Sequence, residues 1–275
     1  ALGSGPAPCP PPLTWLGHPR SLLYSRLVVV SISFSLCFRC FGSVLDCVFR
    51  VRVGVYVRDP RLLRRLLTVF SRCCFEVHVL DSVPPIPGVD VLVSDVELRD
   101  VSVPVVVCRE DLCCVSDRYL ALYIVREVVR RVLGRVFFDR VVLGIDLGLK
   151  RIGVVLLIDG VPAMWWVVRS LDGVLSILRD VAEVLCSSCS VVEIKVGSVP
   201  SSPVSELLER FRRCVSEVFR CCSCLVYLIL VSEREVWRVL PIEYFGLKLP
   251  SDIYDALEIA LCRRYVTREL LTFEK

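Results

Sequence analysis

Two carboxylates of this 275-residue chain lie inside apolar segments, where an unpaired charge is costly to bury. Asp146 follows the run Val-Val-Leu-Gly-Ile, and Glu193 stands between Val-Val and Ile. Two further acids, Asp252 and Asp255, are three residues apart at the start of a predicted helix, so they share one of its faces. Any one of these positions is compatible with an edge or a surface. Together, the four acids predict one shared site.

The chemistry open to such a site is that of a metal centre with oxygen ligands. The chain has only two His residues, His18 and His78, so its C-terminal two thirds cannot hold a Ser-His-Asp triad or a His-based zinc helix. Carboxylates without imidazole favour Mg²⁺ or Mn²⁺. Two such ions, about 3.5–4 Å apart, bind the attacking water and the leaving oxygen of a phosphoryl displacement. The acids therefore predict phosphodiester hydrolysis without a protein nucleophile.

The segments around these acids predict an α/β domain. Apolar runs joined by Gly-bearing turns predict three hairpin-linked strands, after which helices and strands alternate. The expected strands are 140–147, 152–158, 163–169, 190–196 and 225–231, and the expected helices are 171–185, 204–219 and 251–270. The order is three antiparallel-linked strands followed by α-β-α-β-α. It puts Asp146 and Glu193 on strands and the other two acids on the last helix.

A smaller α/β domain with a parallel sheet is expected before it, over residues 51–135. Its predicted strands are 51–57, 75–80, 89–93 and 103–107, and its predicted helices are 60–70 and 117–133. It has no glycine-rich phosphate loop, so docking or substrate orientation is the working hypothesis for its role. Residues 1–50 are Pro-rich at first and poor in acids, and predict a poorly ordered or targeting-like extension. Residues 140–275 form the predicted catalytic domain.

Two segments resemble a known family. Residues 144–154, GIDLGLKRIGV, resemble the opening motif of the RuvC/YqgF branch of the RNase H-like nuclease superfamily, and KRIGV within it is closer to YqgF. Residues 252–261, DIYDALEIAL, are more similar to RuvC, the Holliday-junction resolvase. Glu193 matches the fourth-strand acid of the superfamily, and residues 196–200, VGSVP, resemble the loop that follows this strand in YqgF proteins. The resemblance covers about residues 140–268.

The resemblance implies a divalent-metal-dependent nuclease fold. The implied ligands of two Mg²⁺ or Mn²⁺ ions are Asp146, Glu193, Asp252 and Asp255, with Asp146 bridging the ions. Lys150 and Arg151, in the turn after the first strand, would contact phosphate or stabilise charge that develops in the transition state. Residues 51–135 and the extension belong to neither family.

The expected activity is that of a structure-selective endonuclease acting on Holliday-junction or other branched DNA. The chain has no Asn or Gln, which read adenine by paired hydrogen bonds, so recognition is expected to rest on backbone shape and phosphate. A nuclease for structured RNA such as precursor rRNA, and a catalytically inactive nucleic-acid-binding scaffold, stay open as alternatives. An actin- or Hsp70-like ATPase is disfavoured, because too few residues follow Asp146 for a second phosphate loop. The two-fold symmetry of a four-way junction favours a homodimer.

Composition favours a cytoplasmic protein without a membrane partner. The net charge is +4 and the mean hydropathy is +0.63. The uncharged run at residues 27–38 ends at Arg39 and is too short to span a bilayer. The hydropathy comes from short Val-rich runs that are typical of buried parallel strands. The lack of Asn and the single Met indicate a heat-loving prokaryote.

The cysteines offer a second, weaker pattern. Of the 16 Cys, the pairs Cys186/Cys189 and Cys221/Cys224 have the internal spacing of a zinc ribbon. A long predicted helix separates the pairs, however, and Cys186 closes another helix. Packed thiols or disulfides are therefore favoured over zinc.

Overall fold

The computed structural model describes most of the chain after residue 50. The described residues are 51–82, 88–99, 101–108, 112, 115–148, 150–198, 204–232 and 249–271, with the backbone alone for 204–208. All of them belong to one compact unit. The predicted extension, residues 1–50, lies outside the described residues. None of the described helices has the length and apolar character that a membrane crossing requires.

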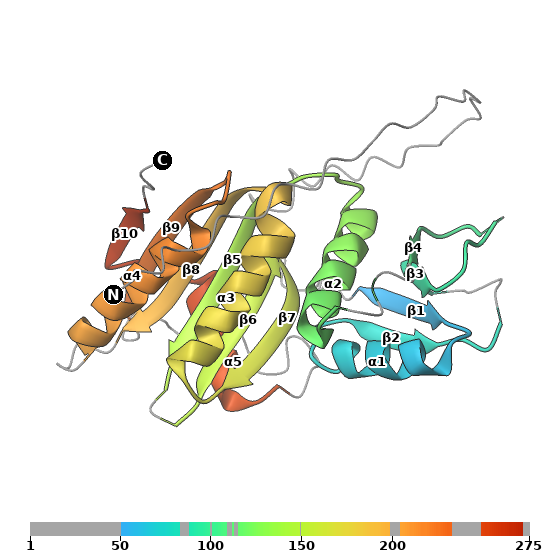
Figure 1. The fold of residues 1–275 in the computed structure, drawn as a ribbon, viewed down its shortest axis with the longest axis horizontal. Coiled ribbons are helices and arrows are strands. Elements are labelled where there is room, and N and C mark those ends of the chain that lie inside the picture. The colour runs from blue at the N-terminus through green and yellow to red at the C-terminus, as the bar shows by residue number, and fades with distance from the viewer. Residues whose placement is uncertain are drawn as a thin grey trace, which may run out of the picture. The chain divides into compact units, whose positions relative to one another are not determined.

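The first half of this unit is built on a parallel sheet of four strands (Figure 1). The strands are β1 (Arg52–Tyr56), β2 (Glu76–Val79), β3 (Val91–Ser94) and β4 (Val105–Val107), in the order β2-β1-β3-β4 and all parallel. Helix α1 (Pro60–Phe70) connects β1 to β2 and begins with proline at its first position, where a missing N–H costs nothing. The predicted small parallel sheet is confirmed.

Helix α2 (Asp117–Leu133) leads from this sheet to the second one. Ser116 caps it by accepting from the backbone N–H of Tyr119, and Gly134 ends it in the left-handed region with φ of 64°. The segment between α1 and β2 also bonds to β7: the N–H of Cys74 donates to the carbonyl of Ala163 at 3.1 Å. Buried side chains from both sheets form one continuous hydrophobic cluster. The division into two domains between residues 135 and 140 stays a prediction.

The second sheet has six strands in the order β10-β9-β8-β5-β6-β7. β5 (Phe138–Leu147), β6 (Ile152–Ile158) and β7 (Val161–Val168) are antiparallel neighbours, and β8 (Cys189–Ser198) and β9 (Leu225–Ser232) continue the sheet parallel to β5. Helices α3 (Leu171–Leu185), α4 (Val204–Phe219) and α5 (Ser251–Leu261) follow β7, β8 and β9 along the chain. The predicted order of three antiparallel-linked strands and then α-β-α-β-α is confirmed.

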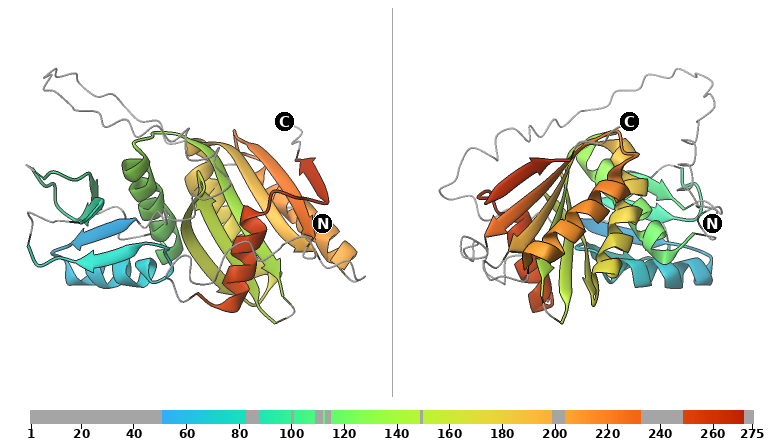
Figure 2. Two further views of the ribbon diagram at one scale, coloured as in Figure 1. Left: turned by 180° about the vertical axis from the view of Figure 1, so that it is seen from behind. Right: turned by 60° about the vertical axis from the view of Figure 1, so that its left-hand side comes forward.

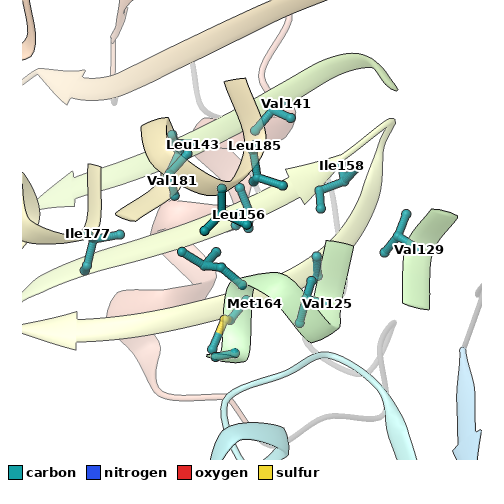
Figure 3. Close-up of a cluster of buried hydrophobic side chains, with 14 of the residues drawn as sticks. Val125, Val129, Val141, Leu143, Leu156, Ile158, Met164, Ile177, Val181 and Leu185 are labelled. Carbon is teal, nitrogen blue, oxygen red and sulfur yellow. The ribbon is translucent and has the colours of Figure 1, made fainter. Parts of the chain in front are cut away.

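Helices cover both faces of this sheet. α3 and α4 lie over one face and α5 crosses the other, as Figure 2 shows from behind. The alternation of strand residues matches the two layers. Leu143 and Leu156 belong to the cluster that contains Val181 of α3 (Figure 3), whereas Val142 packs with Ile253 of α5. The face of β5 that carries even-numbered residues is therefore the face under α5.

One predicted element is wrong over half its length. The last helix was expected over residues 251–270, but α5 ends at Leu261, and β10 (Thr267–Leu270) pairs antiparallel with β9. Cys262 leaves the helical region with ψ of 131°, and the exposed basic residues Arg263 and Arg264 follow it. The edge of β9 offers unpaired backbone groups to the chain that returns beside it, so tertiary pairing overrides the continuing helix pattern.

Candidate metal centre at the carboxyl end of β5

Helix α5 lies directly on the backbone of the sheet because two glycines make room for it. A Cβ atom at Gly144 would lie 2.1 Å from the carbonyl oxygen of Ala256, and one at Gly153 would lie 2.0 Å from the carbonyl oxygen of Asp252. Real Cβ atoms do not approach backbone oxygens so closely. Glycine at these two positions therefore fixes how near α5 comes to β5 and β6.

Asp146 and Asp252 meet at Gly153. Asp146 is the cross-strand partner of Gly153 between β5 and β6, and partners in an antiparallel pair project from the same face of the sheet. The main chain of Asp252 rests on Gly153 from that face. Both aspartates are half-buried, and Asp252 lies in the first turn of α5. The structure thus brings two of the four predicted acids to one corner, at the carboxyl end of β5.

Asp255 lies three residues further along α5, and its side chain is exposed. The backbone between the two helix acids is held down, since the side chains of Ile253 and Ala256 are fully buried against the sheet. Asp255 is therefore within one helical turn of Asp252 and faces solvent.

Lys150 and Arg151 lie in the turn that joins β5 to β6, and both are exposed. The turn is tight: a Cβ at Gly148 would lie 2.4 Å from the carbonyl oxygen of Arg151. Because Leu147 pairs with Ile152, the turn starts at Gly148, two residues beyond Asp146. Both predicted phosphate-contacting cations are thus presented to solvent beside the acidic corner.

Glu193, the fourth predicted ligand, is not brought to this corner. It projects from the same face of the sheet, but its register partner on β5 is Val142, not Asp146. Asp146 lies four residues further along, which is about 13 Å at the usual rise of a strand. The register runs on to Ile145 with Val196, so Gly197 follows at the level of Asp146. This register separates Glu193 from Asp146 along the sheet, so the joint site that the sequence predicts for them stays a prediction.

Glu193 instead forms the centre of a cationic cluster. Its carboxylate is 3.7 Å from Arg140, 3.9 Å from Lys195 and 3.4 Å from Arg268, and the residue is only 6% exposed. The guanidinium of Arg268 also lies over the ring of Tyr227, 4.1 Å from its centroid. The cost of burying the Glu193 carboxylate is thus offset by three cations of the chain.

Lys195 links this cluster to the end of α5. Its ammonium donates to the carbonyl oxygens of Ala260 and Cys262, both at 2.8 Å, where the last turn of the helix leaves acceptors unpaired. Burial lowers the pKa of Lys195, and Glu193 opposes this shift. Lys195 is not among the residues that the sequence pattern singles out. A lysine two residues after a buried acid in an apolar strand is nevertheless a detectable signal of an ion pair on one face of the strand.

No three of the four predicted acids, all of them within the described residues, bring their carboxylate oxygens within 4.8 Å of one another. The group that meets this distance in the described part of the chain consists of Cys186, Cys222 and Cys224. Cys221, which the zinc-ribbon spacing pairs with Cys224, is disulfide-bonded. The acidic corner therefore offers carboxylates from two elements and not a closed ligand cage.

Comparison with known proteins gives similarities to solved structures alone. No protein-family model matches the chain, and no curated protein matches it. RuvC of T. thermophilus in complex with a Holliday junction substrate is 21% identical, with a TM-score of 0.32, over 45% of this chain and 91% of that chain. A further Thermus thermophilus RuvC structure is 21% identical, with a TM-score of 0.29, over 44% of this chain and 91% of that chain.

Marinitoga piezophila Argonaute in complex with a 5′ OH guide RNA is also similar. It is 10% identical, with a TM-score of 0.25, over 67% of this chain and 40% of that chain. None of these similarities assigns the chain to a family.

Proposed function

We propose that this protein hydrolyses phosphodiester bonds of nucleic acid with divalent cations bound by Asp146, Asp252 and Asp255. The observation that carries the proposal is the meeting of Asp146 and Asp252 on either side of Gly153, next to the exposed cations of the β5–β6 turn. Carboxylates that converge from elements about 100 residues apart in sequence are suited to share a divalent cation.

The donors at this corner suit Mg²⁺ or Mn²⁺. Both ions prefer oxygen ligands, and Mg²⁺ keeps several waters and needs only one or two protein carboxylates beside the phosphates of its substrate. An open pair of aspartates with a third at the rim is compatible with this mode of binding. When bound, such a cation supplies Lewis-acid activation of the phosphate and lowers the pKa of the attacking water.

The side chains of the turn provide the contacts to substrate. Lys150 and Arg151 can bind the phosphates that flank the bond to be cut, and they add positive charge where negative charge develops in the transition state. The rigid seat of α5 on Gly144 and Gly153 fixes Asp252 relative to Asp146. Preorganised charges need no rearrangement during the reaction, which is their main contribution to rate.

Branched DNA is the substrate we propose. The similarity of residues 252–261 to RuvC supports it, as does the lack of Asn and Gln for reading adenine, since such a protein depends on phosphate geometry. A four-way junction differs from a duplex in the path of its phosphate backbones. The exposed cations of the β5–β6 turn can distinguish these two paths.

The test is cleavage of four labelled substrates of equal length: a four-way DNA junction, a DNA duplex, a single strand and a structured RNA. We expect the junction to be cut with Mg²⁺ or Mn²⁺ and not to be cut when EDTA removes the divalent cations. The cleavage rate should fall at least about 100-fold in Asp146→Asn and in Asp252→Asn. Binding of Mn²⁺, followed by the loss of its free electron-paramagnetic signal, should weaken in the same two variants.

Asp172→Asn is the matched control. Asp172 is an exposed first-turn aspartate of α3, on the opposite face of the sheet from α5. It should leave both cleavage and Mn²⁺ binding unchanged. Preferential cutting of the RNA would favour the RNA-processing alternative, whereas junction binding without any cutting, and without Mn²⁺ binding, would establish the scaffold alternative and overturn the proposal.

A further inference from the structure

Four cysteines gather at the end of the six-stranded sheet that lies opposite the acidic corner, beside the amino ends of β8 and β9. Cys186 lies in the single 3-10 turn that follows α3, and Cys189 is the first residue of β8. Cys222 and Cys224 lie between the end of α4 and the start of β9. Because β8 and β9 are parallel neighbours, with Val191 beside Leu225, both connections meet at the amino ends of these strands.

Three of these thiols already have the spacing of a metal site. The sulfurs of Cys186, Cys222 and Cys224 all lie within 4.8 Å of one another. In a tetrahedral zinc site with Zn–S bonds of about 2.3 Å, neighbouring sulfurs are about 3.8 Å apart. A contraction of about 1 Å or less would therefore place the three sulfurs at bonding distance from one ion.

Cys189 is the fourth cysteine beside this group. Its thiol interacts with that of Cys224, which also interacts with Cys186 and Cys222. Cys186, Cys189 and Cys224 are each less than 9% exposed, and Cys222 is half-buried. The Cys222 N–H donates to the carbonyl of Phe219 at 3.0 Å, so the loop that carries the second pair is anchored to α4. The cluster thus holds four thiols on an anchored backbone, three of them buried.

Disulfide formation explains the arrangement less well. One disulfide uses two sulfurs, yet three lie mutually close and a fourth contacts the same central thiol. All four cysteines are free thiols in the structure, whereas their neighbour Cys221 is disulfide-bonded. Four thiols around a common centre match the donor set and number that Zn²⁺ takes in structural sites.

We propose that Cys186, Cys189, Cys222 and Cys224 bind one structural Zn²⁺. The ion would join the α3–β8 connection to the α4–β9 connection and so hold together the two βα crossovers that complete the sheet. With four protein ligands it has no open position for substrate, and it lies at the end of the sheet remote from Asp146, so its contribution is to stability. This site does not depend on the proposed nuclease activity.

The test is the zinc content and metal spectrum of the full chain, purified with a phosphine reductant and reconstituted with Zn²⁺. After dialysis we expect one zinc per chain by mass spectrometry of the metal. Replacement by Co²⁺ should give sulfur-to-cobalt charge-transfer absorption and the intense visible bands of a tetrahedral thiolate site. Chelation should lower the midpoint of thermal unfolding, which re-addition of Zn²⁺ should restore.

Two ligand variants and one control assign the residues. Cys224→Ser should lose the bound zinc, and Cys189→Ser should shift the Co²⁺ bands to those of a three-sulfur site and weaken retention of zinc at least 10-fold. Cys214→Ser, which replaces a half-buried thiol of α4 outside the cluster, should keep both the bound zinc and the Co²⁺ bands of the unmodified chain. If Cys224→Ser does not fold, the spectrum of the unmodified chain still decides. A reduced wild-type chain without retained zinc and without cobalt–thiolate absorption overturns the proposal, as does zinc content that the ligand variants do not change.

Discussion

The carbonyl oxygen of Asp252 lies directly over Gly153, so close that a methyl group at residue 153 would be 2.0 Å from it. Across the strand pair, the partner of Gly153 is Asp146. One missing side chain therefore brings the start of α5 and the end of β5 together. The candidate site depends on this contact as much as on the acids themselves.

Gly153→Ala should displace the first turn of α5 and separate Asp252 from Asp146. Since the obstacle is backbone, which cannot rotate away, we expect a loss of about 2–4 kcal/mol in the free energy of unfolding, with weaker Mn²⁺ binding in the fraction that folds. Urea denaturation and the Mn²⁺ titration measure the two effects. Gly54→Ala is the control: there the nearest atoms are methyl groups of Leu80 and Leu92, which can shift, so a smaller loss is expected. Equal losses in the two variants would contradict this account.

Glu193→Gln should reduce stability while leaving divalent-cation binding intact. The substitution preserves shape but leaves Arg140, Lys195 and Arg268 without their shared counter-charge. Both arginines are partly exposed and solvent screens their charge. We therefore expect a loss of about 1–3 kcal/mol in the free energy of unfolding, measured by urea denaturation. Glu209→Gln, at an exposed acid of α4, should cost less than about 0.5 kcal/mol. If Glu193→Gln abolished Mn²⁺ binding, the separation of Glu193 from Asp146 would be wrong.

Lys195→Met should loosen the end of α5. The ammonium is the donor to the carbonyls of Ala260 and Cys262, and it places positive charge at the carboxyl end of the helix. Its loss should cost about 2 kcal/mol or more and speed hydrogen exchange at the amide of Cys262, which bonds to Glu258. Lys150→Met removes an exposed lysine from the β5–β6 turn and should change neither quantity. Unaltered exchange at Cys262 would show that Lys195 does not hold this turn.

The thiols of the buried Cys73 and the half-buried Cys74 should make the protein less stable at alkaline pH. Burial raises the pKa of Cys73 and raises that of Cys74 from 9.0 to about 12. Above pH 9 the unfolded chain releases these protons and the folded chain keeps them, so stability is complete below pH 9 and is lost as pH rises towards 12. Each thiol adds a slope of up to about 1.4 kcal/mol per pH unit. Cys74→Ala should flatten the pH dependence of urea denaturation relative to Cys214→Ala, and identical slopes would refute the assignment.

Neutralising Lys150 and Arg151 together should weaken binding to DNA of every sequence. Each phosphate contact releases about one counterion, so the slope of log affinity against log salt should fall in magnitude by roughly 1.8 for a duplex. Fluorescence anisotropy over a series of salt concentrations gives this slope. The charge-matched control is Arg213→Ala with Arg220→Ala, an exposed residue of α4 and an exposed residue directly after that helix. A control slope that falls as much would mean that the contacts are not made by the β5–β6 turn.

Local pattern was sufficient to predict most elements. Helices 60–70, 117–133, 171–185 and 204–219 have the bounds that apolar periodicity and Ser or Pro caps predict, because both signals act within a few residues. The same pattern failed after Leu261. There the free edge of β9, which local sequence does not reveal, converts residues 267–270 into a strand.

The sequence by itself determined that Asp146 lies near the end of a buried strand, that Asp252 lies in the first turn of a helix, and that carboxylates rather than imidazole are available to any site near them. Tertiary structure alone decided which of these groups meet. The parallel register of β5 and β8 sets Glu193 beside Val142, where its carboxylate pairs with Arg140, Lys195 and Arg268. The turn before β9 brings the sulfur of Cys222, rather than that of Cys221, close to Cys186. Register and turn geometry follow from the packing of whole faces against one another, so a pattern read along one segment cannot contain them.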